Sequence, residues 1–84
     1  MLAEQFDITR KVEKWILDRG KVSTLALTKF SILYASFSSW SEEAGQFAES
    51  AKAFSIELSR LGFRRGFIDG GSKAFRGIAI KRLG

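Results

Sequence analysis

The spacing of apolar residues changes at Gly62, and this change constrains the fold more than any other feature of the sequence. Before Gly62, apolar residues recur every three or four positions, which is the period of amphipathic helices. After it, short β-prone runs flank the sequence Asp-Gly-Gly-Ser at 69–72, which is typical of a tight hairpin turn. We therefore expect helices up to Gly62 and a two-stranded antiparallel hairpin after it.

A first helix is predicted between Asp7, a good N-cap residue, and Gly20, which is placed to end it. Its apolar positions recur at helical spacing among charged residues: Ile8, Val12, Trp15 and Ile16. The stretch that follows, residues 20–28, is rich in β-branched and small residues. Its pattern is ambiguous, and it is interpreted as a loop plus a short strand around residues 25–27.

A second helix is predicted from Thr28, its N-cap, to about Gly45. A third runs from Glu49 or Ser50 to Leu61, where the following glycine stops it. The inward faces of the two helices are apolar stripes: Phe30, Leu33, Tyr34, Phe37 and Trp40 in the second, and Ala51, Phe54, Leu58 and Leu61 in the third.

Three helices followed by a hairpin is the order of a winged helix-turn-helix, in which the hairpin is called the wing. The predicted fold class is therefore mainly α with a small antiparallel β-hairpin, and residues 1–84 are expected to form a single domain on one modest core. Gly77 interrupts the second hairpin strand, which predicts a bulge there. In a winged helix the third helix usually enters the major groove of DNA, and the wing lies against the backbone or the minor groove.

The composition removes several kinds of chemistry. The chain has no Cys and no His, so it lacks the usual ligands for zinc and other transition metals, and also the commonest general base. It contains neither a phosphate-binding G-x-x-x-x-G-K-[ST] loop nor an apolar run long enough to span a bilayer. We expect no enzymatic activity, no cofactor, no metal and no membrane association from this chain.

The net charge of +5 is concentrated at one end of the sequence. The balance of basic and acidic residues is zero in residues 1–20, −1 in residues 21–49 and +6 in residues 50–84. Segregated positive charge of this kind indicates a polyanionic partner more strongly than a uniformly basic surface would.

The second and third predicted helices and the hairpin also resemble a known family. The run from Leu33-Tyr34 through "SFSSWSEEAGQFAESAKAFSIELSRLGF", closed by "AFRGIAI", resembles the C-terminal domain of phage- and plasmid-type replicative primase-helicases. The resemblance covers roughly residues 26–82 and rests on the joint order and spacing of aromatics, glycines and basic residues. Ala48 and Ser41 depart from it, since that family commonly has Pro and Cys there, and the connection before the second helix is longer.

The resemblance implies a module appended to a larger DNA-replication protein. In such proteins a helicase motor of the superfamily 3 kind precedes a C-terminal winged helix that binds DNA, often at an origin. It therefore implies that a motor precedes residue 1 in the parent protein, and that any homo-oligomer forms through this motor. It also implies a location in the cytoplasm of a bacterial or archaeal host cell. Duplex DNA is the expected partner, in preference to single strands.

The predicted DNA-binding residues lie on the outward face of the third helix and on the two hairpin strands. The helix supplies Lys52, Ser55, Ser59 and Arg60, and the hairpin supplies Arg64, Arg65, Lys73 and Arg76. The four hairpin cations are expected to gather within a small area and to bind the phosphate backbone without reading sequence. Most aromatic rings are expected in the core, and Phe67 is the exception, with a place beside the turn.

Two alternatives remain open from the sequence. The cations are able to pair instead with nearby acids, of which Asp69, Glu57 and the pair Glu42 and Glu43 are the candidates. The domain is also able to serve as a protein–protein interaction or dimerisation module without direct DNA binding, with Glu42, Glu43 and Glu49 as an acidic patch.

Overall fold

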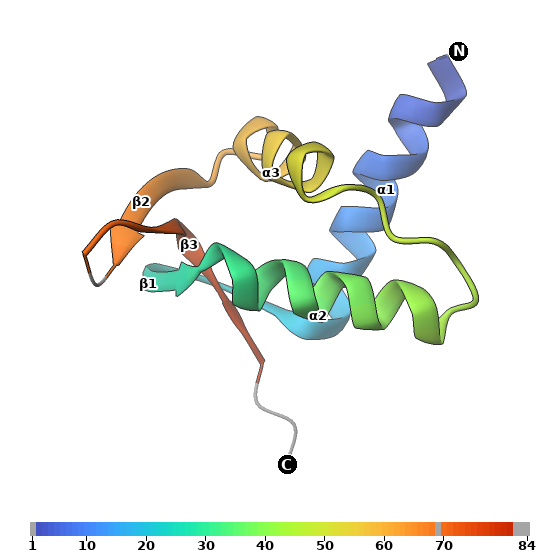
Figure 1. Ribbon diagram of the computed structural model, residues 1–84. Helices are drawn as coiled ribbons and strands as arrows, with labels where there is room; N and C mark the ends of the chain where they lie inside the picture. Colours follow the sequence, from blue (N-terminus) through green and yellow to red (C-terminus); the bar gives the residue numbers. More distant parts are fainter. Residues whose placement is uncertain (1, 69, 82–84) are drawn as a thin grey trace.

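The computed structural model describes residues 2–68 and 70–81, with side chains from Ile8 onward (Figure 1). The elements in chain order are α1 (Leu2–Arg19), β1 (Gly20–Lys29), α2 (Phe30–Glu43), α3 (Ala51–Arg60), β2 (Arg64–Ile68) and β3 (Ser72–Ile80). The three helices and the β2–β3 hairpin confirm the sequence prediction. Asp69, the first residue of the predicted turn, lies outside the described residues.

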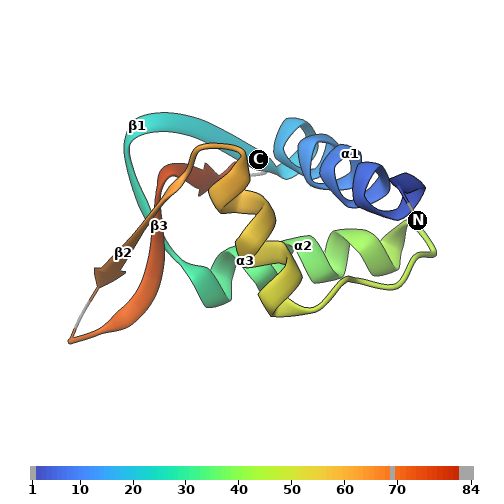
Figure 2. The same ribbon diagram turned by 90° about the horizontal axis from the view of Figure 1, so that it is seen from above.

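The hairpin belongs to a three-stranded antiparallel sheet whose order is β1-β3-β2. A loop with a short strand was predicted before α2, and this was wrong, because all of Gly20–Lys29 forms β1 and pairs with β3 at both ends. The observed architecture is three helices with a small antiparallel sheet. In both views the β2–β3 hairpin projects from the body of the domain beside α3 (Figures 1 and 2).

The pairing of β1 with β3 is interrupted opposite Gly77. Val22 pairs with Ile78 and Leu27 pairs with Arg76, so residues 23–26 of β1 face a single residue of β3. Gly77 has a φ of 95°, a backbone angle that residues with a side chain rarely adopt. The irregularity predicted at Gly77 is therefore present, but the extra residues lie on the partner strand.

Two predicted N-caps are wrong. Helix α1 begins at Leu2 rather than at Asp7, since residues 2–5 are strong helix formers and extend the helix toward the N-terminus. Thr28 does not cap α2, because its hydroxyl donates a hydrogen bond of 2.8 Å to the carbonyl of Ile78 across the sheet. Helix α2 begins at Phe30 without a side-chain cap.

Gly20 ends α1 as predicted, for a different physical reason. It is the first residue of β1 and does not have the left-handed conformation of a helix-ending glycine. A Cβ atom at this position would lie 3.0 Å from both the Cα and the carbonyl oxygen of Ile16. A side chain at this position would push against the backbone of the last turn of α1, so glycine suits the point where the chain leaves the helix.

The core consists mainly of aromatic and branched side chains from all three helices and β3. Trp15, Phe37, Phe54 and Phe75 are buried, which confirms that these rings are structural. The other buried members of the cluster are Val12, Leu33, Leu58 and Ile78. Phe67 is 69% exposed, a position that the sequence left open for this ring, but it is not the only exception among the described rings, because Phe47 is 97% exposed. In the described part of the chain, no helix is both long and apolar enough to cross a membrane.

Ser50, one of the two residues at which the sequence placed the start of the third helix, is the N-cap of α3, and this gives a test of the local structure. The hydroxyl of Ser50 accepts a hydrogen bond of 3.1 Å from the amide of Ala53. Ser50→Ala should lower the free energy of unfolding by about 1 kcal/mol, measured by urea denaturation. Ser39→Ala, on the exposed side of α2, is the matched control and should change it by less than about 0.5 kcal/mol. Equal effects would contradict the capping role.

Candidate nucleic-acid interface

Helix α3 is held against the other two helices by its aromatic side. The rings of Phe54 and Phe37 stack with centroids 4.5 Å apart, and Trp15 meets Phe54 edge-on at 5.3 Å. Leu58, one turn further on, is also buried. Because these contacts occupy the inward side of α3, its polar side is left at the surface, where Lys52, Ser59 and Arg60 are exposed.

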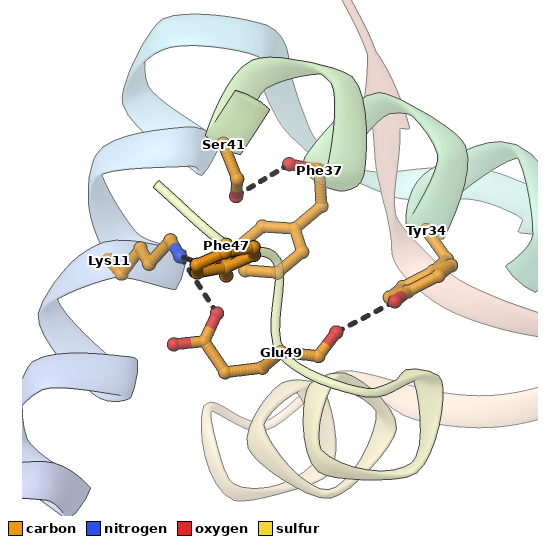
Figure 3. Close-up of polar contacts among 6 residues, drawn as sticks. All are labelled: Lys11, Tyr34, Phe37, Ser41, Phe47 and Glu49. Atoms are coloured by element: carbon orange, nitrogen blue, oxygen red, sulfur yellow. Dashed lines mark hydrogen bonds and ion pairs between the residues drawn. The ribbon is translucent and has the colours of Figure 1, made fainter. Parts of the chain in front are cut away.

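A lysine from α1 fixes the connection between α2 and α3. The ammonium of Lys11 donates to the carbonyl of Phe47 at 2.7 Å and to the carboxylate of Glu49 at 2.9 Å (Figure 3). The hydroxyl of Tyr34 donates to the carbonyl of Glu49 at 2.7 Å. The Lys11 ammonium also lies 5.5 Å from the centroid of the Phe37 ring. These contacts join α1, α2 and the segment that leads into α3.

A second polar contact holds the far end of α3. Glu57 is only 3% exposed and accepts a hydrogen bond of 2.6 Å from the hydroxyl of Thr9 on α1. The guanidinium of Arg60 lies 3.9 Å from the other carboxylate oxygen of Glu57. This burial was not predicted, although Glu57 lies three residues after Phe54 and beside Leu58, on the edge of the apolar stripe.

A groove of about 540 Å³ lies between α3 and the β2–β3 hairpin. Its polar lining is Lys52 and Ser55 from α3, Arg65 from β2 and Lys73 from β3. Its apolar lining is Phe30, Ala51 and Ile56. Four of the eight predicted DNA-binding residues therefore line one groove.

The strand register divides the four hairpin cations into two pairs. Arg65 pairs with the buried Phe75, and Lys73, two residues before Phe75, lies on the same face of the ribbon. Arg64 pairs directly with Arg76, and successive side chains alternate, so these two lie on the opposite face. The four cations therefore lie on two faces of one short hairpin: Arg65 and Lys73 line the groove, and Arg64 and Arg76 lie behind it.

Gly66 lies beside the side chains of Arg76 and Leu27. A Cβ atom at Gly66 would lie 3.6 Å from Nε of Arg76 and 3.3 Å from Cδ1 of Leu27. No role was predicted for this glycine. Arg64 and Arg76 are like charges directly opposite each other, an arrangement that destabilises an antiparallel pair unless an anion compensates it.

The cations of the groove and the hairpin have no acidic partner in the described residues. The ion pairs found among the described residues lie elsewhere: Lys11 pairs with Glu49 at 2.9 Å, Arg19 with Glu43 at 2.8 Å and Arg60 with Glu57 at 3.9 Å. Pairing of the hairpin arginines with Glu57, Glu42 or Glu43 is therefore not observed, while Asp69 lies outside the described residues. Two members of the predicted acidic patch, Glu43 and Glu49, already pair with cations of α1.

The remaining predicted residues lie outside the groove lining. Ser59 and Arg60 are exposed on the last turn of α3, and Arg60 lies beside Glu57. Among the described residues, no cluster of acids has the makeup of a metal site. The sequence matches no model of a known protein family and no curated protein.

The Lys11 contacts give a test of how firmly α3 is positioned. Lys11→Met keeps the apolar stem but removes the charged hydrogen bonds to the Phe47 carbonyl and the Glu49 carboxylate. We expect the free energy of unfolding to fall by about 1.5–3 kcal/mol in urea denaturation. Lys14→Met, on an exposed position one turn further along α1, should change it by less than about 0.5 kcal/mol. Equal losses of unfolding free energy in the two variants would show that the Lys11 hydrogen bonds do not hold the connection between α2 and α3.

Proposed function

We propose that this domain is a winged helix-turn-helix that binds duplex DNA through α3 and the β2–β3 hairpin as its wing. The observation that carries the proposal is the groove between these two elements, where the cations Lys52, Arg65 and Lys73 converge without acidic partners in the described residues. The order of three helices and a hairpin supports it.

The composition of α3 favours contact with the phosphate backbone. Lys52 lies in the first turn of α3, where the amide groups and the helix dipole already favour an anion. Ser55, one turn on, has a small side chain that permits close approach to a groove wall. The helix has no Asn or Gln and only one Arg, at its end, so it offers few side chains of the kind that read base edges. We expect binding that depends weakly on sequence.

The rear of the hairpin adds a second contact to the proposed interface. Arg64 and Arg76 face each other with no anion between them from the described residues. A phosphate group beside the pair would relieve the repulsion between the two guanidiniums. In this arrangement the hairpin contacts DNA with both faces.

A role in replication rests on the family resemblance of residues 26–82. On that reading the domain serves a phage- or plasmid-type primase-helicase, and recognises an origin or template through the same groove. Only the resemblance supports this part of the proposal, whereas the groove supports DNA binding by itself.

Dimerisation is the second candidate function, and one observation favours it. A groove of about 290 Å³ between α1 and β1 is lined by Ile16, Leu17, Val22, Leu61 and Phe63, together with Glu13. Leu17 is 76% exposed and Val22 is 65% exposed. A second copy of the chain would cover these side chains, and sedimentation equilibrium would then show a dimer. A dimer with no affinity for DNA would favour this function over the first.

The salt dependence of DNA binding tests the groove. The anisotropy of a labelled duplex should report binding at low salt in the range of about 1–100 µM, with an affinity that falls steeply as salt rises. Replacing both Lys52 and Lys73 by Ala should weaken binding to all sequences alike and reduce the salt slope by about 2.

The matched control is Lys21→Ala, an exposed lysine on β1 at the end of the sheet away from the hairpin turn. It should leave the salt slope unchanged. Undetectable binding by the wild type at about 0.1 mM protein, or binding that does not depend on salt, would contradict the proposed function.

The arginine pair predicts opposite effects on stability and on DNA binding. Arg64→Gln removes the repulsion with Arg76 and keeps a long polar side chain. At low salt the free energy of unfolding should stay level or rise by about 0.2–1 kcal/mol, while the affinity for duplex DNA falls. Urea denaturation and anisotropy measure the two quantities. A loss of stability without a loss of affinity would show that the pair is structural.

A further inference from the structure

Phe67 is an exposed aromatic ring set among the cations of the proposed interface. Its side chain is 69% exposed, and it pairs across the hairpin with Lys73. Arg65, two residues earlier on the same strand, lies on the same face. The ring is therefore next to two of the three cations that line the groove.

The surroundings of Phe67 leave its ring open to a flat partner. Lys73, opposite it, is exposed, and the neighbouring Gly66 has no side chain. In the described part of the turn, Gly70 and Gly71 have φ values of 78° and 113°, so they favour glycine and keep the end of the hairpin slim. No described ring stacks on Phe67, in contrast to the rings of the core.

The chemistry of DNA limits what this ring is able to contact. Arg65 along the strand and Lys73 opposite the ring attract phosphates, whereas the exposed phenyl ring gains free energy by covering a flat apolar surface. In a closed duplex the faces of the bases are covered by their neighbours in the stack. A base face becomes available where the duplex ends in a single strand, and stacking of a base on an aromatic ring tolerates any sequence.

We infer that Phe67 stacks on the first unpaired base at a junction between duplex and single-stranded DNA, while Arg65 and Lys73 hold the adjoining phosphates. This inference rests on the proposed DNA binding and names its substrate class. The alternative use of the ring is as an apolar wedge in the minor groove of an intact duplex, which would not require an unpaired base.

The experiment compares two DNA molecules that share the same duplex. In the first, both ends are closed by non-nucleotide linkers, so that no base is unpaired. In the second, one end carries a short single-stranded tail with 2-aminopurine at its first unpaired position. Affinity is measured by anisotropy and stacking by 2-aminopurine fluorescence, for the wild type and for Phe67→Ala and Phe67→Tyr.

The matched control is Phe47→Ala. Phe47 is 97% exposed and belongs to the α2–α3 connection, at the opposite side of the domain from the hairpin (Figures 1 and 2). The substitution Phe47→Ala removes the same kind of ring from the surface and leaves the groove lining unchanged. Its effect on either DNA should be less than about twofold.

We expect Phe67→Ala to weaken binding to the tailed DNA by about tenfold and to abolish the fluorescence change, while binding to the closed duplex changes by less than about twofold. Phe67→Tyr should retain both the affinity for the tailed DNA and the fluorescence change. The salt slope should stay the same, because no charge is removed. Circular dichroism of Phe67→Ala should match the wild type, since the ring is exposed.

The contrary outcomes are distinct from a failure of DNA binding. An equal loss of affinity on both DNA molecules would overturn the inference in favour of a minor-groove wedge. No loss on either, with binding retained, would overturn it while leaving the proposed function intact. If the wild type fails to bind the closed duplex at low salt, the proposed function itself fails.

Discussion

The stacking of Phe54 on Phe37, with Trp15 edge-on to both, is the interaction on which the rest of the structure depends. One ring comes from each helix, so the three contacts fix α3 relative to α1 and α2 at the same time. Aromatic pairs of this geometry are worth about 0.5–1.5 kcal/mol beyond the free energy of burying their surface. In a domain of this size that is a large share of the net stability. The orientation of α3, and with it the position of Lys52 in the groove, follows from this packing.

The polar contacts of α3 act at its two ends, where the aromatic rings do not reach. Lys11 holds the connection before the helix through the Phe47 carbonyl and the Glu49 carboxylate. Thr9 holds the last turn through Glu57, which would otherwise be a buried carboxylate without a hydrogen bond. Both partners lie on α1. Helix α1 therefore supports both ends of α3, although it contributes no residue to the groove lining.

The sequence predicted features that depend on local signals and missed those that depend on distant partners. Helix α3 begins at the Ser50 cap and ends before Gly62, and both signals are adjacent to the element they bound. The full extent of strand β1 was not predicted because its pairing with β3 joins residues more than 40 positions apart, and because the irregularity opposite Gly77 breaks the alternation. Thr28 has a good capping side chain, but its hydroxyl donates a hydrogen bond to the carbonyl of Ile78 instead of capping α2.

The candidate site shows the same division. The eight proposed contact residues were found from charge and helical phase, but their grouping follows from the strand register. The two-residue period already places Arg64 and Arg65 on opposite faces, and Phe67 on the face of Arg65. What the sequence does not contain is the identity of the core-facing side, which is fixed when Phe75 packs against Phe30. Only then does Arg65, the partner of Phe75, belong to the groove.

Internal ion pairing sharpens the charge asymmetry that the sequence suggested. Glu49 and Glu43 are matched by Lys11 and Arg19 of α1, and these pairs contribute little to the field at a distance. The groove cations Lys52, Arg65 and Lys73 have no such partners in the described residues. The positive potential over the groove is therefore greater than a net charge of +5 spread over the whole surface would give. Because each of the three side chains is exposed, a polyanion is able to reach all of them without rearrangement of the fold.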